Sequence, residues 1–190
     1  LLAGGVEFFE AVLAIRCPDD REAPACTTTF PATASRLFVC GSAAAWHKAR
    51  QRQCAAHGIP VLTMPAELAT SQPSVAARKR WIESAVQAIA PTGAAMMAIG
   101  SQDAEVSPPV LARRLAEAVQ GALESIRVDW LLVEGGATAA ALVRQMRWTR
   151  FRVRSPHSPG VVALDIDGTR QPALILKPGS YEWPDYVWPR

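Results

Sequence analysis

The sequence has few charged residues and no long apolar run. Only 19% of its 190 residues are charged, and the net charge is +3. The longest apolar runs, 93–100 and 130–136, are strand-sized and fall short of the roughly 18 residues that a membrane span needs. The hydrophobic share of 49% is nevertheless enough for a packed core. The composition therefore predicts a globular protein with no membrane partner.

Cysteine and histidine are scarce and scattered. The four cysteines form no CxxC pair and have no companion histidine at zinc-ligand spacing, so we expect free thiols and no protein-held metal site. The chain also begins without the basic flank of a secretory signal. Together these features predict a reducing, cytoplasmic location. The residues concerned are Cys17, Cys26, Cys40, Cys54, His47, His57 and His157.

Lysine is nearly absent, and arginine supplies 17 of the 20 basic residues. The one basic cluster, 144–154, is spread over a helix end and a following strand. Cations suit the negative end of a helix dipole, and a nucleic-acid surface usually carries a denser basic stripe. We therefore expect no nucleic-acid partner.

From Arg36 onward, apolar runs alternate with helical patterns. The runs are continuous, which is typical of strands buried on both faces, and the helices between them predict parallel crossovers. The expected strands are 37–40, 59–63, 94–99 and 130–133; the expected helices are 43–57, 74–89, 108–127 and 137–147.

The end of the chain has a different pattern. Asp167-Gly168 lies between two apolar runs, 161–165 and 172–176, and predicts a hairpin with a two-residue turn. The aromatic tail after it, with Trp183 and Trp188, is interpreted as core cover rather than a stacking platform. The expected fold is a three-layer α/β/α domain with a mainly parallel central sheet and a C-terminal β-hairpin.

A Pro-rich and Thr-rich stretch, 17–35, is expected to be a linker. It separates a short helical pattern in 1–16 from the domain predicted for 36–190. We interpret residues 1–16 as the end of a preceding unit.

Three expected strands end in glycine followed by a small residue. The motifs are Gly41-Ser42, Gly100-Ser101 and Gly135-Gly136-Ala137-Thr138. Glycine lets a ligand approach the backbone, and the helix that follows directs its first N–H groups at an anion such as phosphate. We expect Gly136 to lie where the backbone closes on that phosphate. The alternative interpretation is a tight turn with a capped helix.

A competing motif is Asp165-Ile166-Asp167-Gly168-Thr169 after an apolar strand. It resembles the first motif of haloacid-dehalogenase-like phosphatases, in which Asp165 would be the nucleophile and Asp167 the acid/base. The motif should open such a fold and precede a helix. Here it stands near the chain end and precedes another apolar run, which favours the hairpin.

Four ordered segments resemble the C-terminal nucleotide-binding domain of the four-carbon acid sugar kinase family. The segments are Leu37-Phe38-Val39-Cys40-Gly41-Ser42, Leu132-Val133-Glu134-Gly135-Gly136-Ala137-Thr138-Ala139, Pro159-Gly160-Val161 and Leu176-Lys177-Pro178-Gly179-Ser180-Tyr181.

The resemblance implies ATP-dependent phosphorylation of a sugar acid such as threonate or erythronate, with Mg²⁺ as a cofactor. It implies that residues 1–16 end a substrate-binding N-terminal domain otherwise absent from this sequence. It leaves the catalytic residues unknown and a homodimer open. By resemblance, the nucleotide site is lined by Ser42, Gly135, Gly136, Ala137, Thr138 and Gly179.

Two positions depart from the family pattern. Ala137 stands where the family usually has an acidic residue, and Glu182 stands where its tail usually has a glycine. These departures support an alternative, a non-catalytic module that binds a nucleotide or an anionic metabolite.

Overall fold

The computed structural model describes residues 31, 33–41, 50–100, 105–158, 160–169, 172–179 and 181–189. Several predictions from the sequence therefore lie outside the described residues. They are the segment 1–16, most of the linker, the first half of the helix expected at 43–57, Ser42 and the loop 101–104.

Seven strands form one sheet in the order β2-β3-β1-β4-β7-β6-β5. The first five strands in this order, β2, β3, β1, β4 and β7, run parallel to one another. The remaining two, β6 and β5, are added antiparallel beside β7. The strands are β1 (Arg36–Cys40), β2 (Val61–Thr63), β3 (Ala94–Ala98), β4 (Trp130–Glu134), β5 (Phe151–Ser158), β6 (Val161–Ile166) and β7 (Ala173–Lys177).

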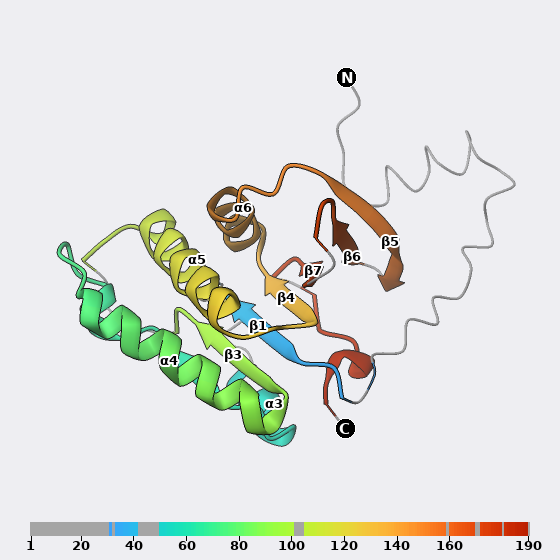
Figure 1. Cartoon of the computed structure of the whole chain (residues 1–190), viewed down its shortest axis with the longest axis horizontal. Helices are drawn as coiled ribbons and strands as arrows, with labels where there is room; N and C mark the ends of the chain where they lie inside the picture. The colour runs from blue at the N-terminus through green and yellow to red at the C-terminus, as the bar shows by residue number, and fades with distance from the viewer. Residues whose placement is uncertain are drawn as a thin grey trace, which may run out of the picture.

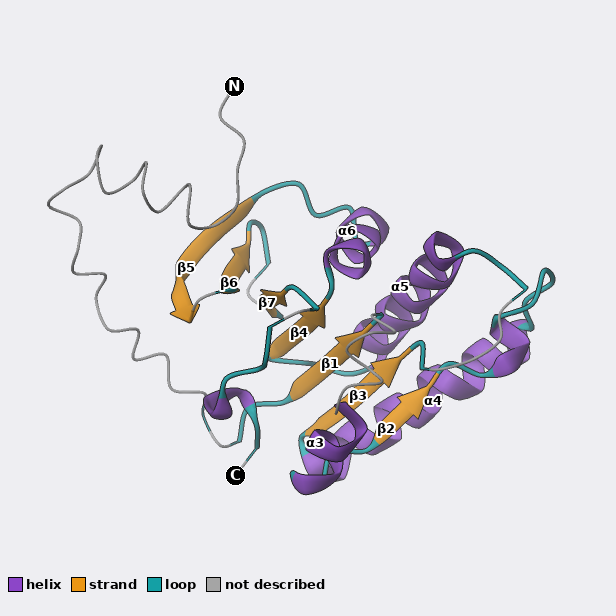
Figure 2. Ribbon diagram, turned by 180° about the vertical axis from the view of Figure 1, so that it is seen from behind, coloured by secondary structure: helices purple, strands orange, loops and turns teal. Residues whose placement is uncertain are grey.

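Helices cover both faces of the parallel part, as the three-layer expectation required (Figures 1 and 2). The helices are α3 (Gln51–Ala56), α4 (Val75–Thr92), α5 (Pro108–Ser125) and α6 (Gly136–Gln145), with short 3₁₀ turns η2 (Ala66–Leu68) and η3 (Asp185–Val187). Every residue of β1, β3 and β4 is buried, which explains their continuous apolar sequence.

Two hydrophobic clusters lie on the two faces of the sheet. The cluster under α4, α5 and α6 is built on the β1 side chains Leu37 and Val39. The other is built on Phe38 of β1 and includes Cys54 of α3 together with the C-terminal tail. No helix in the described part of the chain is long and apolar enough to cross a membrane.

The aromatic tail covers the α3 face, which confirms its interpretation as core cover. The Trp188 ring stacks on Phe38 at 5.2 Å and on His57 at 5.0 Å between centroids. Trp183 meets Phe38 edge-on, and Trp183 and Trp188 are both buried. The C-terminal tail therefore packs with α3 on this face of the sheet.

The helix ends follow local sequence signals. The Ser74 hydroxyl accepts a hydrogen bond from the Ala77 N–H and caps α4, which ends at Gly93 in the left-handed conformation. Pro108 begins α5, where its missing N–H costs nothing.

The C-terminal hairpin is present and a turn lies at Asp167-Gly168 as predicted, but β7 does not follow that turn directly. The strands β6 and β7 pair antiparallel, with Leu164 opposite Leu174. The Thr169 N–H does close a turn on the Ile166 carbonyl, and the chain then continues before β7 begins. A shorter connection joins β5 to β6, where Ser158 pairs with Val161.

Candidate functional site

The strands β1 and β4 are neighbours, and the chain leaves them toward opposite faces. After β1 the next described helix, α3, packs on one face, whereas α6 follows β4 on the other. Doubly wound folds bind ligands beyond the carboxyl ends of the strands at such a reversal. The glycine motifs at 41 and 135–136 stand at the carboxyl ends of β1 and β4.

Gly41 and Thr138 are in contact at the carboxyl end of β1. A Cβ atom on Gly41 would lie 2.0 Å from the Thr138 Oγ1, so only glycine leaves room for this side chain. Thr138 is buried on α6. The contact joins the end of β1 to the first turn of α6.

Gly135 makes the turn that starts α6. Its φ of 98° and ψ of 130° are available to glycine but rarely to other residues. Gly136 has no positive φ and is exposed, and a Cβ added to it would have no neighbouring atom within 4 Å. The special conformation thus belongs to Gly135, and the space beside Gly136 is open.

A buried charge network lies at the same edge, on the α3 face. The Glu134 Oε1 accepts hydrogen bonds from Lys177 Nζ at 2.7 Å and from Arg50 Nη2 at 2.9 Å. All three side chains are at most 3% exposed. Glu134 Oε2 and Arg50 Nε have no hydrogen-bond partner among the described residues. Burial lowers the pKa of Lys177, and its contact with Glu134 opposes that shift.

Two further contacts extend the network toward the tail. Glu182 is 67% exposed, and its Oε2 lies 3.7 Å from Arg50 Nη1 and accepts a hydrogen bond from Gln53 at 3.1 Å.

The tail also contacts the segment that begins β6. A Cβ on Gly160 would lie 2.6 Å from the Tyr181 ring. The segments around 160 and 181 therefore pack directly on each other.

The structure brings most of the predicted site residues to one edge of the sheet. Gly135, Gly136, Ala137 and Thr138 form one turn, and Gly179 follows β7, whose Lys177 carbonyl accepts a hydrogen bond from the Gly135 N–H at 2.9 Å. Ser42 lies outside the described residues. The sequence reasoning missed Arg50, Glu134 and Lys177 as site residues. The sequence does carry one signal for them, because each of the apolar runs that form β4 and β7 ends in a charged residue, Glu134 and Lys177.

Within the described residues, no group of three or more His, Cys, Asp or Glu side chains could hold a metal ion. Cys40 and Cys54 are buried thiols, and burial raises the pKa of the Cys54 thiol to about 12.

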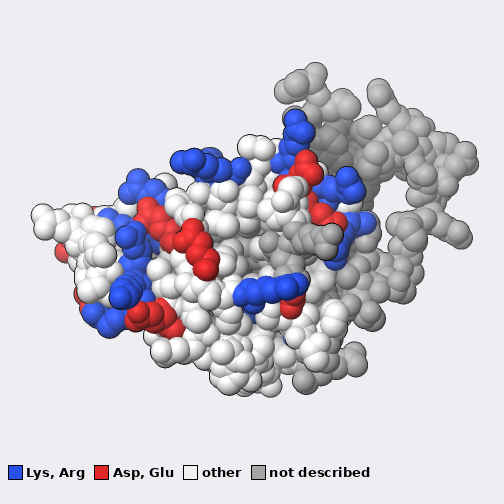
Figure 3. Space-filling view, viewed as in Figure 1, with Lys and Arg blue, Asp and Glu red and all other residues white. Residues whose placement is uncertain are grey.

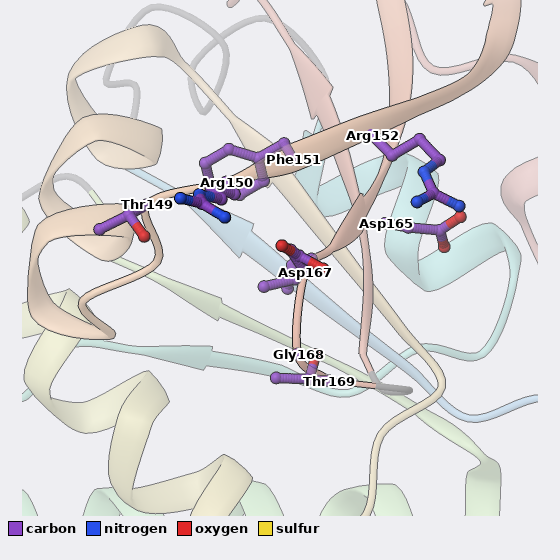
Figure 4. A pocket seen from close by; sticks show the side chains of 9 residues that line it. Thr149, Arg150, Phe151, Arg152, Asp165, Asp167, Gly168 and Thr169 are labelled. Atoms are coloured by element: carbon purple, nitrogen blue, oxygen red, sulfur yellow. The ribbon is translucent and has the colours of Figure 1, made fainter.

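A separate groove of about 620 Å³ lies at the other end of the strands, where β6 ends and β7 begins. Figure 4 shows Arg152 and Asp165 pointing toward one another, away from Asp167. The Asp165 carboxylate pairs with Arg154 at 2.8 Å. Asp165 thus lies in an antiparallel hairpin strand, as the hairpin interpretation required, and the phosphatase-like interpretation has no structural support.

Arginine and lysine do not form a continuous stripe on the described surface in Figure 3. Basic and acidic side chains are interspersed there, and several pair with each other. Arg78 lies 2.9 Å from Glu117, and Lys79 lies 3.9 Å from Glu83.

The sheet order and the helices on both of its faces define an α/β protein in which Gly135 and the first turn of α6 follow the carboxyl end of β4. The model of the family described as "nucleotide-binding C-terminal domain" matches residues 37–181. The chain therefore belongs to this family, which confirms the resemblance found in the sequence. No curated protein matches the chain.

Solved structures of low identity share the fold. A Haemophilus influenzae protein of the DUF1537 family has a TM-score of 0.67 at 16% identity, covering 94% of this chain and 44% of its own. A Bordetella bronchiseptica DUF1537 protein, described as a domain-swapped dimer with bound citrate, has a TM-score of 0.64 at 20% identity. That match covers 82% of this chain and 41% of the other. The chain thus spans less than half the length of these structures.

Proposed function

We propose that the chain is the ATP-binding domain of a kinase that phosphorylates a four-carbon sugar acid. The observation that carries the proposal is the pair of neighbouring strand ends of β1 and β4, where Gly41 packs against Thr138 and Gly135 starts α6. The first N–H groups of a helix lack partners within it, and the helix dipole favours an anion at this end. The phosphates of a nucleotide fit these donors.

The residues proposed to bind the nucleotide are Ser42, Gly135, Gly136, Ala137, Thr138 and Gly179. The open space beside Gly136 admits a phosphate close to the backbone.

Mg²⁺ is proposed to arrive with the nucleotide rather than to reside in the protein. The described residues offer no cluster of ligands for it. Mg²⁺ commonly keeps several waters and is held largely by the phosphates of its nucleotide. When bound, it would neutralise phosphate charge.

The acceptor site is proposed to lie in a second domain. The chain spans about two fifths of the neighbours' lengths, which supports a larger protein of this kind. We propose that this domain precedes residues 17–35 and supplies the sugar-acid site, and that the whole protein acts in the cytoplasm. The neighbour described as a domain-swapped dimer supports a homodimer as the assembly.

A second candidate is a non-catalytic module that binds a nucleotide or an anionic metabolite. It is favoured by Glu182, whose carboxylate contacts Arg50 and Gln53 beside the proposed site and offsets positive charge there. Ala137 also leaves the turn without the acidic residue usual in the family.

Calorimetry with Mg·ATP tests the proposed site. We expect weak, millimolar binding to this chain, and loss of that binding in Gly136→Val, because the added side chain would occupy the phosphate space. The structure shows open space at this position, so the variant should remain folded. Asp167→Asn, at the other end of the strands, is the matched control and should bind as the parent does.

Absence of heat from the folded parent at millimolar nucleotide would reject the site. A folded Gly136→Val that binds normally would reject its placement. The two candidate functions are separated with the full-length source protein, because only the kinase converts ATP to ADP in the presence of threonate or erythronate.

A further inference from the structure

The Lys177 ammonium is buried and uses all of its hydrogens within the protein. An ammonium has three N–H donors. In Lys177 they go to Glu134 Oε1 at 2.7 Å, to the Pro178 carbonyl at 2.9 Å and to the Tyr181 carbonyl. The side chain is 0% exposed. A lysine bound in this way has no donor left for a ligand.

Two of these three acceptors belong to the turn that carries Gly179. The Tyr181 N–H donates to the Pro178 carbonyl at 3.3 Å, which closes the turn weakly by itself. Lys177 Nζ bridges the first and last carbonyls of the same four residues. The shape of this turn therefore depends on a charge buried beneath it.

Lys177 is also bound twice to the turn before α6. Its side chain contacts Glu134, and its main-chain carbonyl accepts the Gly135 N–H at 2.9 Å. One residue thus fixes the Gly179 turn against the Gly135 turn. Both turns belong to the proposed nucleotide site.

We propose that Lys177 is a positioning residue, which sets the Pro178–Tyr181 turn against the start of α6 so that both receive one nucleotide. The inference rests on the proposed function and extends it. Lys177 acts through Glu134 and the two turn carbonyls and does not contact the phosphates. Its removal should loosen the turn and weaken binding of every nucleotide by the same factor.

The test compares Lys177→Met with Lys79→Met, a control at an exposed lysine of α4. Hydrogen exchange, followed by mass spectrometry without nucleotide, reports on the turn. Calorimetry with Mg·ATP and Mg·ADP reports on the site. For Lys177→Met we expect at least tenfold faster exchange in residues 178–182 and at least tenfold weaker binding of both nucleotides. Lys79→Met should match the parent.

The outcomes separate this inference from the function on which it rests. Unchanged exchange in 178–182, or a loosened turn with unchanged affinity, would overturn the inference alone. A loss confined to ATP would also overturn it, because it would indicate direct contact with the terminal phosphate. A folded parent that binds neither nucleotide would overturn the proposed function, and the inference with it.

Lys177→Met could fail to fold, because it leaves Glu134 buried with one cation fewer. Glu134→Gln is then the second variant, since the amide keeps the shape and an acceptor oxygen while losing the charge. We expect the same changes at about threefold or more. A folded Glu134→Gln with parental exchange and parental affinities would refute the positioning role.

Discussion

Replacing Gly41 with alanine tests the contact that joins β1 to α6. The new Cβ would lie 2.0 Å from Thr138 Oγ1 and 3.1 Å from both Thr138 Cβ and Cγ2, where ordinary contacts are 3.4–4 Å. Thr138 cannot easily move aside, because its side chain is buried and β-branched. Overpacking of this kind costs about 1–3 kcal/mol.

The substitution also has a stabilising part. The φ of Gly41 is not positive, so alanine can adopt its backbone conformation, and alanine reduces the entropy of the unfolded chain. That part is worth about 0.4–1 kcal/mol. We therefore expect Gly41→Ala to lower the free energy of unfolding by on the order of 1–2 kcal/mol.

Urea denaturation followed by circular dichroism measures this free energy. Gly136→Ala is the matched control, because nothing lies within 4 Å of its Cβ position, and it should be neutral or slightly stabilising. Thr138→Ala removes Oγ1 and Cγ2 and should relieve most of the cost in the double variant. If Gly41→Ala is as stable as the parent, or if Thr138→Ala brings no relief, the steric reasoning is refuted.

Two further predictions concern residues outside the site. Arg147 has a φ of 56° at the C-terminal end of α6, where the Trp148 N–H reaches back to the Val143 carbonyl in a motif that favours glycine. Arg147→Gly should therefore raise the free energy of unfolding by up to about 1 kcal/mol in the same urea assay, whereas Arg144→Gly, inside the helix, should lower it by a similar amount; equal effects would contradict this. Cys54 should resist alkylation by iodoacetamide at pH 8 until the protein is unfolded, because its buried thiol stays protonated to about pH 12; rapid labelling of the native protein, read by peptide mass spectrometry, would contradict its burial.

The parallel core of the fold could be predicted from the sequence because its strands are buried on both faces. The apolar runs at 94–99 and 130–133 coincide with β3 and β4 to within one residue. Strand β5 was anticipated only loosely, since its first four residues are all exposed and no apolar pattern marks its bounds. The turn at Asp167-Gly168 lies where the sequence predicts it, but the connection to β7 is longer than two residues, because β6 ends at Ile166 and β7 begins only at Ala173.

Only the glycine turns of the candidate site could be predicted from the sequence. Glycine motifs mark where the backbone must turn, so the turn at Gly135 could be identified from the local sequence alone. The role of Lys177 depends on register, which places Lys177 beside Glu134 across two strands that are distant in sequence. No local pattern encodes that pairing, and Arg50 joins it from a third element.

The position of β1 has a consequence for how the protein is made. β1 lies in the middle of the sheet, yet its two partners, β3 and β4, are synthesised long after it. Until β3 has left the ribosome both edges of β1 are unpaired, and until residue 134 has followed one edge stays unpaired; such segments are exposed to aggregation. Pairings this distant in sequence also slow folding. Any fragment that ends before β4 should therefore be poorly soluble, and two fragments divided between β1 and β3 should regain the core only when combined.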